Sequence, residues 1–371
     1  MKISSFPNGR GALPYQTILQ MIRAGFVSGA NENNVKPASL DLSLSKEIYK
    51  VEGVFQPRVG ETVRDVLKKI KKEKFSIDKP LSREQMYIAR LNETLELPSS
   101  IYAYCNPKST SGRVDVHVRL IADGVPRYDA VGPAGYKGEL WVSIVPKTFS
   151  VTLFEGLSLN QLRFFNGDTR LNELETEIAM RQHDLLWSIP KDRSFKFEEL
   201  KIKDSDGSLI LTLDLEGKDL GYESMPSKEI LDLSKIGHFN YKKFFKPIRK
   251  KGEYVYLKKG SFYILSTNEA VRVPPELACE MVPMDEKSGE FRSHYAGFID
   301  PGWGWGKKGE GRGRALTLEV RPFEDLIVRH GQPIAKIKFE KMAEIPEMVY
   351  DSLASNYVNQ TGPKLSKHFK S

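Results

Sequence analysis

A polar segment, Pro107–Arg113, has the residue types of a phosphate-binding turn. It combines hydroxyl groups, a glycine and two cations on a short stretch of chain. Backbone N–H groups and hydroxyls on a tight turn can bind phosphate oxygens, and a guanidinium can bind two of them at once. The segment therefore predicts phosphate contacts, although a solvated serine-rich loop has the same composition. The candidate residues are Lys108, Ser109, Thr110, Ser111 and Arg113.

The segment 314–320 is predicted to be a strand that carries a carboxylate near its end. In an alternating strand, Leu316 and Leu318 share one face, and Thr317 and Glu319 share the other. Two interpretations of Glu319 stay open. It is either an ordinary surface glutamate or a partly buried base with a raised pKa that activates water.

A turn is predicted at Asp300-Pro301-Gly302-Trp303, because Asp-Pro-Gly has the chemistry of a reverse turn. The apolar residues before it, which follow Tyr295 and Ala296, place this turn on a β-hairpin. Such a hairpin could contact a flat base through its backbone groups. A turn without a ligand is the alternative.

The end of the sequence, residues 356–369, combines an aromatic ring, amides, hydroxyls and lysines. Tyr357, Gln360 and Lys364 could close over a phosphorylated ligand, and Lys367 offers a second cation. Terminal segments are often disordered, so a solvated end is the other interpretation.

Length and charge limit the class of protein. The 371 residues suit one large domain or two smaller ones. Lys and Arg outnumber Asp and Glu by 56 to 48, an excess that suits an anionic ligand. Because the basic residues are scattered, we expect no nucleic-acid partner. No apolar run approaches a membrane span and the first residues lack a secretory signal core, so we expect no membrane partner and no secretion. The scarcity of cysteine makes a reducing cytoplasm the expected compartment.

The two cysteines, Cys105 and Cys279, exclude a disulfide framework and a cysteine-based zinc finger. They also exclude the zinc nucleoside deaminases, whose signature is H-x-E followed by P-C-x-x-C. We therefore expect no zinc.

An internal duplication organises the chain. Asn92–Pro98 reads against Asn268–Pro274 at an offset of 176, and further matches follow in the same order. Each copy has short apolar or alternating runs between Gly and Pro, which predict a mainly β fold of the sandwich or jelly-roll type. Helices are predicted at 14–24, 63–71 and 171–186. We expect two domains, 1–195 and 196–371.

Taken in chain order, the four segments resemble the dCTP deaminase branch of the dUTPase-like superfamily. That branch carries G-R-S-S-x-x-R, then I-D-P-G-W/F, then a strand ending in a catalytic Glu, then Y-x-x-Q-x-G. Ile299–Trp303 matches the second motif without change, and Tyr357–Gly362 matches the last. Lys108 replaces the family's first Arg, Ser111 an apolar residue, and Asn356 an expected Lys.

The resemblance implies two tandem dUTPase-like β-barrels of the β-clip type with a few peripheral helices. It implies hydrolysis of dCTP to dUTP and ammonia, with Glu319 as the base. Backbone groups near Ala296 and Leu318 would hold the base edge, and Asp300 and Trp303 would shape the sugar pocket. Mg²⁺ would arrive with the triphosphate. The substrate-binding residues that it implies are Lys108, Ser109, Thr110, Ser111, Arg113, Tyr295, Ala296, Asp300, Trp303, Leu318, Tyr357, Gln360 and Lys364.

The two copies differ in complementary ways. At the 176 offset, Glu319 stands opposite Ser143, so the first copy lacks the base. The phosphate segment stands opposite Asp285, Glu286, Lys287 and Gly289, although a gapped alignment would restore Ser288 and Arg292. We therefore hypothesise that the first domain holds the triphosphate and the second does the chemistry.

Rival functions share this sequence pattern. A dUTPase, or an enzyme that both deaminates and cleaves the triphosphate, would have the same fold. A non-catalytic nucleotide-binding regulator is the more distant alternative. The sequence leaves the formation of a homo-oligomer open.

Overall fold

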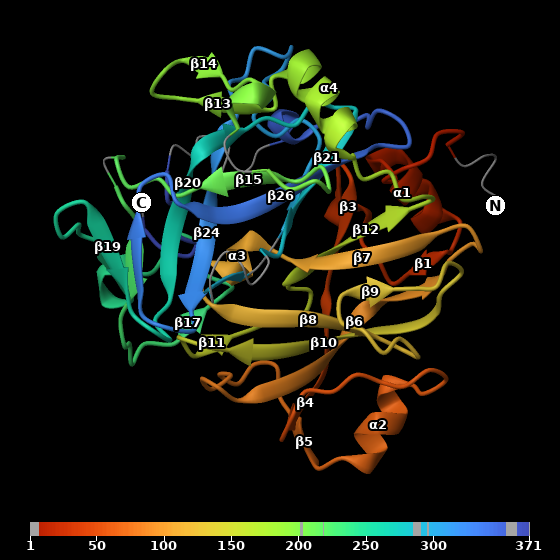
Figure 1. Cartoon of the computed structure of the whole chain (residues 1–371). Coiled ribbons are helices and arrows are strands. Elements are labelled where there is room, and N and C mark those ends of the chain that lie inside the picture. The colour runs from red at the N-terminus through yellow and green to blue at the C-terminus, as the bar shows by residue number, and fades with distance from the viewer. Residues whose placement is uncertain are drawn as a thin grey trace. The chain divides into compact units, whose positions relative to one another are not determined.

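The computed structural model describes residues 7–200, 203–217, 219–284, 291–294, 297–353 and 362–370. The chain is mainly β with a few short helices (Figure 1). It forms two compact units. Unit 1 holds the chain up to Asp168, Pro226–Asn240 and the segment from Ser366; unit 2 holds Thr169–Met225 and Tyr241–Leu365. The predicted division between residues 195 and 196 stays a prediction. No helix among these residues is long and apolar enough to cross a membrane.

Unit 1 is built on two antiparallel sheets. One has the order β5-β4-β6-β10-β8 with β1 beside β6, and the other has the order β2-β3-β12-β7-β9. The first comprises β1 Val27–Ser28, β4 Leu44–Val51, β5 Lys72–Phe75, β6 Met86–Glu96, β8 Val116–Ala122 and β10 Lys137–Pro146. The second comprises β2 Val35–Lys36, β3 Ser39–Leu42, β7 Tyr102–Pro107, β9 Ala130–Val131 and β12 Asn160–Phe165. A short parallel pair joins β11 Val151–Thr152 to β17 Leu231–Asp232.

Unit 2 repeats this plan. Its larger sheet runs β14-β13-β20-β16-β18, with β24 and β22 continuing from β20, and its smaller sheet runs β15-β26-β21-β23. The larger comprises β13 Leu186–Ser188, β14 Arg193–Ser194, β16 Tyr222–Ser224, β18 Phe245–Pro247, β20 Tyr263–Val271, β22 Phe291–His294 and β24 Arg314–Pro322. The smaller comprises β15 Leu209–Thr212, β21 Leu277–Val282, β23 Phe298–Ile299 and β26 Pro333–Lys341. β19 Tyr254–Leu257 pairs with β25 Leu326–Arg329.

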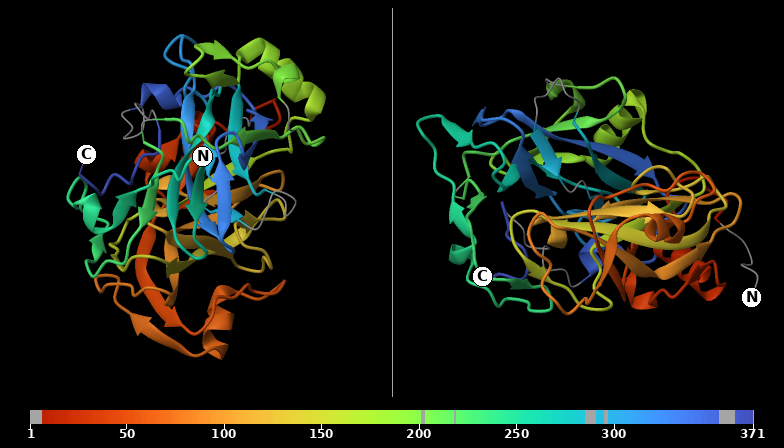
Figure 2. Two further views of the ribbon diagram at one scale, coloured as in Figure 1. Left: turned by 60° about the vertical axis from the view of Figure 1, so that its left-hand side comes forward. Right: turned by 90° about the horizontal axis from the view of Figure 1, so that it is seen from below.

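The helices follow their capping signals. α2 Val63–Lys69 begins at a capping box made by Thr62 and Asp65, and α4 Glu173–His183 at one made by Asn172 and Glu175. α1 Tyr15–Arg23 completes the three helices that the sequence predicted. Figure 2 shows α2 and α4 on the outside of the strands of their own units. A further helix, α3 Ser109–Gly112, is a single turn.

The strand registers reproduce the internal duplication. In unit 1, Ser143 of β10 stands opposite Ile88 of β6. In unit 2, Glu319 of β24 stands opposite Ile264 of β20, which is the same pair moved by 176 residues. The sequence offset therefore corresponds to equivalent strands in two similarly built units.

Each unit has a buried glutamate at the equivalent position, Glu93 in unit 1 and Glu269 in unit 2. Glu93 is fully buried on β6 and accepts hydrogen bonds from the N–H (3.0 Å) and the hydroxyl (2.8 Å) of Ser43, which lies between β3 and β4. Glu269 on β20 accepts the same two bonds from Thr212 at the end of β15, both at 2.7 Å. Each bond set holds the point where the chain leaves one sheet for the other. Burial raises the pKa of Glu93 to about 7, and it also raises the pKa of Glu269.

This burial makes stability depend on pH. The folded chain keeps the Glu93 proton between about pH 4.5 and 7, whereas the unfolded chain releases it. The free energy of unfolding should therefore fall by about 3 kcal/mol as the pH rises through that window. We expect Glu93→Gln to remove this part of the fall, measured by urea unfolding at half-unit pH steps. Glu96→Gln, on the exposed end of the same strand, is the matched control. Equal pH slopes in Glu93→Gln and the wild type would contradict the assignment.

Candidate active site

The predicted phosphate segment is a cationic turn in unit 1. Lys108 precedes the single turn α3, and its ammonium forms an ion pair with the buried carboxylate of Asp41. Arg113 closes the turn and is 3% exposed, and its Nε donates to the Ser109 hydroxyl at 2.9 Å. The turn thus brings together two of the cations that the sequence predicted.

Ser111 connects this turn to the chain at Leu159, just before β12. Its hydroxyl lies 2.7 Å from the carbonyl oxygen of Lys108 and 2.9 Å from that of Leu159, and the side chain is buried. The Ser111 hydroxyl therefore donates its proton to backbone carbonyl oxygens. It would have to break that hydrogen bond before it could donate to a phosphate. Ser109 and Thr110 are partly exposed.

The end of the chain brings another lysine to the same turn. The Ser366 hydroxyl donates to the Thr110 carbonyl oxygen at 3.1 Å. The next residue, Lys367, is half-buried, and its pKa is lowered by burial and by the charge of Lys108. Lys364, by contrast, belongs to unit 2 and is exposed, and its N–H donates to the Thr317 hydroxyl at 3.2 Å.

Glu319 is a buried carboxylate in unit 2. It is 2% exposed on β24, where β20 lies on one side and β22 on the other. Its backbone stands opposite Ile264 and His294. The interpretation as a surface glutamate is therefore wrong. Leu318 points the other way, into the core, which limits any role of Leu318 to its backbone.

The Asp-Pro-Gly-Trp turn forms, but the predicted β-hairpin is wrong: β23 before the turn pairs with β21 in the smaller sheet, whereas β24 after it pairs with β20 and β22 in the larger sheet. The Trp303 N–H donates to the Asp300 carbonyl oxygen at 3.1 Å, and both side chains are buried. Gly302 has φ +85° and lies against Val349 and Tyr350. The Tyr350 ring lies 4.8 Å from that of Trp303, centre to centre. Val349 and Tyr350 are therefore held against this turn.

An ion pair that no sequence pattern predicts supports this arrangement. Arg314 binds Asp351, and its guanidinium lies 5.5 Å from the centre of the Trp303 ring. Asp351 also accepts the Gly306 N–H at 2.8 Å. Both charged groups are largely buried, so the pair ties β24 to the segment after Val349.

The equivalent face of unit 1 is filled. Trp141, which corresponds to Thr317, is fully buried and packs in one cluster with Val63 and Leu67 of α2. Arg64 of the same helix lies 5.1 Å from the indole ring. Ser143 therefore shares a face of β10 with a bulky indole, and α2 covers that face.

Four predicted site residues lie outside the described residues: Tyr295, Ala296, Tyr357 and Gln360. The segment 285–290, which the alignment set against the phosphate turn, lies outside them as well. Among the described residues, no group of three His, Cys, Asp or Glu side chains is placed to hold a metal ion.

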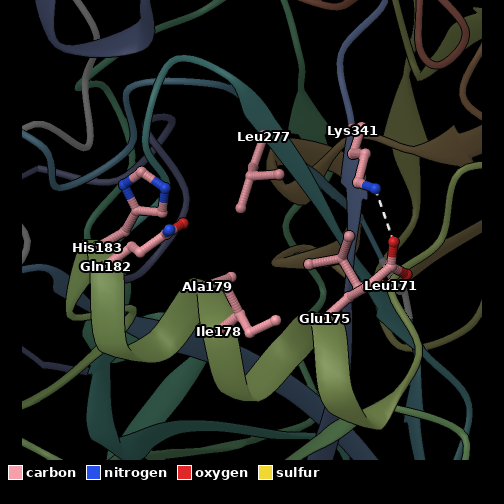
Figure 3. A pocket seen from close by; sticks show the side chains of 8 residues that line it. All are labelled: Leu171, Glu175, Ile178, Ala179, Gln182, His183, Leu277 and Lys341. Atoms are coloured by element: carbon pink, nitrogen blue, oxygen red, sulfur yellow. Dashed lines mark hydrogen bonds and ion pairs between the residues drawn. The ribbon is translucent and has the colours of Figure 1, made fainter.

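A pocket of about 340 Å³ opens beside α4 in unit 2 (Figure 3). Lys341 donates to Glu175 at 2.6 Å along one wall. No predicted site residue lines this pocket, so we do not assign the chemistry to it. Its lining residues are Leu171, Glu175, Ile178, Ala179, Gln182, His183, Leu277 and Lys341.

The chain is similar to known proteins over most of its length. The family model of the 2'-deoxycytidine 5'-triphosphate deaminase N-terminal domain matches residues 9–168, and that of the C-terminal domain matches residues 187–369. The crystal structure of 2'-deoxycytidine 5'-triphosphate deaminase from Agrobacterium tumefaciens is 33% identical, with a TM-score of 0.82 over 92% of this chain and 98% of that one. No curated protein sequence matches the chain. The motif resemblance is thereby confirmed: the chain belongs to the 2'-deoxycytidine 5'-triphosphate (dCTP) deaminase family.

Proposed function

We propose that this protein hydrolyses dCTP to dUTP and ammonia, with Glu319 as the general base. The observation that carries this proposal is the burial of Glu319 on β24, in a chain of the dCTP deaminase family. A carboxylate removed from bulk water and held by two neighbouring strands is positioned to accept and return a proton.

The reaction needs one proton carrier. Glu319 takes a proton from the water that attacks C4 of the cytosine ring. It then passes that proton to N3 or to the departing amine, so that water and dCTP give dUTP and ammonia. Asp300 and Trp303 shape the sugar pocket, and backbone groups near Leu318 hold the edge of the base.

The triphosphate would bind to the cations of unit 1. Lys108 and Arg113 supply positive charge, and of the two tail lysines predicted for this role, Lys364 and Lys367, Lys367 lies beside Lys108. Mg²⁺ would be carried by the triphosphate. The fold type would be the dUTPase-like β-clip barrel in each unit. Cys105 and Cys279 are buried free thiols, which suits a reducing, cytoplasmic location.

The test is to incubate the protein with dCTP and Mg²⁺ and to measure ammonia, dUTP and pyrophosphate together. We expect ammonia and dUTP in equal amounts without pyrophosphate, and much slower turnover of CTP because its 2'-hydroxyl must enter the sugar pocket. Pyrophosphate in step with ammonia would favour the bifunctional alternative. Nucleotide binding without ammonia would overturn the proposal in favour of a regulator.

A further inference from the structure

Asp41 is a buried carboxylate that the sequence interpretation left unused. It lies on β3, is 5% exposed, and forms an ion pair with Lys108. Lys36 is 3.9 Å from the same Oδ2 atom. The other oxygen, Oδ1, has no hydrogen-bond partner among the described residues. Burying an ionised carboxylate costs free energy unless a cation lies beside it. The attraction of Asp41 therefore holds the Lys108 ammonium in position.

The end of the chain is anchored in unit 1. The N–H groups of His238 and Phe239 donate to the His368 carbonyl oxygen at 3.0 and 3.1 Å, and the His368 ring bonds to the Lys235 carbonyl oxygen at 3.0 Å. His368 and Phe369 are buried. The segment Ser366–Lys370 is therefore a fixed part of unit 1, and Lys367 has a defined place beside Thr110.

The charges at this place do not balance. Lys108 and Lys36 both lie beside the Asp41 carboxylate, and Lys367 interacts with Lys108 and with Asp41. Three lysines thus share one carboxylate in a partly buried site, where like charges repel more strongly than in water. An anion with several oxygens would relieve that repulsion.

We infer that Asp41 and the anchored segment Ser366–Lys370 preorganise the triphosphate subsite, Asp41 by orienting Lys108 and the segment by supplying Lys367. Asp41 is a positioning residue in this account, since a carboxylate repels phosphate and gains its effect only through the lysine. The inference rests on the proposed function and assigns a task to two residues within it.

Tripolyphosphate is the probe, because it has no base or sugar and its binding can be measured whether or not dCTP is deaminated. For Asp41, charge and position give opposite predictions. Removing a negative charge should by itself strengthen anion binding, whereas loss of Lys108 orientation should weaken it. We expect Asp41→Asn to weaken tripolyphosphate binding about tenfold in calorimetry.

A double-mutant cycle connects this effect to Lys108. In a Lys108→Met background, Asp41→Asn should cause no further loss. Asp41→Glu keeps the charge and moves it by one methylene, so it tests position even if Asp41→Asn does not fold; we expect weaker binding. Binding as tight as, or tighter than, that of the wild type in either Asp41 variant would overturn the role of Asp41.

A separate set of variants tests Lys367. Lys367→Ala should weaken tripolyphosphate binding about tenfold, and Lys367→Arg should keep most of it. Lys370→Ala is the matched control, because Lys370 is exposed at the end of the same segment. Equal binding in Lys367→Ala and Lys370→Ala would overturn the role of the segment.

Discussion

Glu319→Gln should lower the rate of ammonia release from dCTP about a thousandfold and leave dCTP binding within a fewfold of the wild type. The amide has nearly the shape of the carboxylate but cannot take a proton from water. Because Glu319 is held by backbone pairing on both sides of β24, the substitution should not move the strand. Turnover is measured by ammonia release and binding by calorimetry.

Glu324→Gln is the control for this prediction. Glu324 is exposed just beyond the end of β24, so its substitution should leave both quantities unchanged. Near-normal deamination by Glu319→Gln would eliminate Glu319 as the base. Loss of both binding and turnover would instead indicate that the carboxylate is needed for the fold of unit 2, and it would contradict the predicted separation of the two.

Gly302→Ala should destabilise unit 2 by about 3 kcal/mol and lower turnover. Gly302 has φ +85°, and a Cβ placed there would lie 2.6 Å from the Val349 Cβ and 3.0 Å from the Tyr350 nitrogen. Relief of that overlap would push Tyr350 away from the Trp303 ring. The free energy is measured by urea unfolding and turnover by ammonia release.

Gly331 provides a matched comparison. It has φ +76° but nothing within 4 Å of the position of a Cβ. Gly331→Ala should therefore cost only the backbone strain, about 1 kcal/mol, and leave turnover unchanged. Equal losses of stability in the two variants would show that the close approach of Val349 and Tyr350 contributes nothing.

Local sequence patterns predicted the local structure around Glu319 and the positions of three helices. Alternation over 314–320 predicted that the Glu319 side chain lies on one face of the strand and those of Leu316 and Leu318 on the other. The structure confirms that Leu318 enters the core. The three capped or amphipathic segments became helices near their predicted bounds. These features depend on neighbours in sequence, which is why pattern alone could find them.

Features that depend on distant contacts were missed. Asp41 lies 67 residues from Lys108 in sequence, and no local pattern links them. An acidic residue between Leu40 and Leu42 in a short apolar run was the available signal. The anchoring of His368 by residues 235–239 likewise gave no sign in either segment. The buried pair Glu93 and Glu269 was visible as an Asn-Glu match between the copies, but a polar match did not reveal burial.

The packing of Trp141 under α2 has a consequence for the history of the chain. Restoring a carboxylate at position 143 would gain nothing while the indole and the side chains of Val63 and Leu67 fill that face. Emptying the face first would remove core contacts and destabilise unit 1 before any activity returned. A second reactive carboxylate in unit 1 is therefore not reached by a single substitution. Under the proposed assignment, the chemistry depends on Glu319, and the residue at position 143 serves the packing of unit 1.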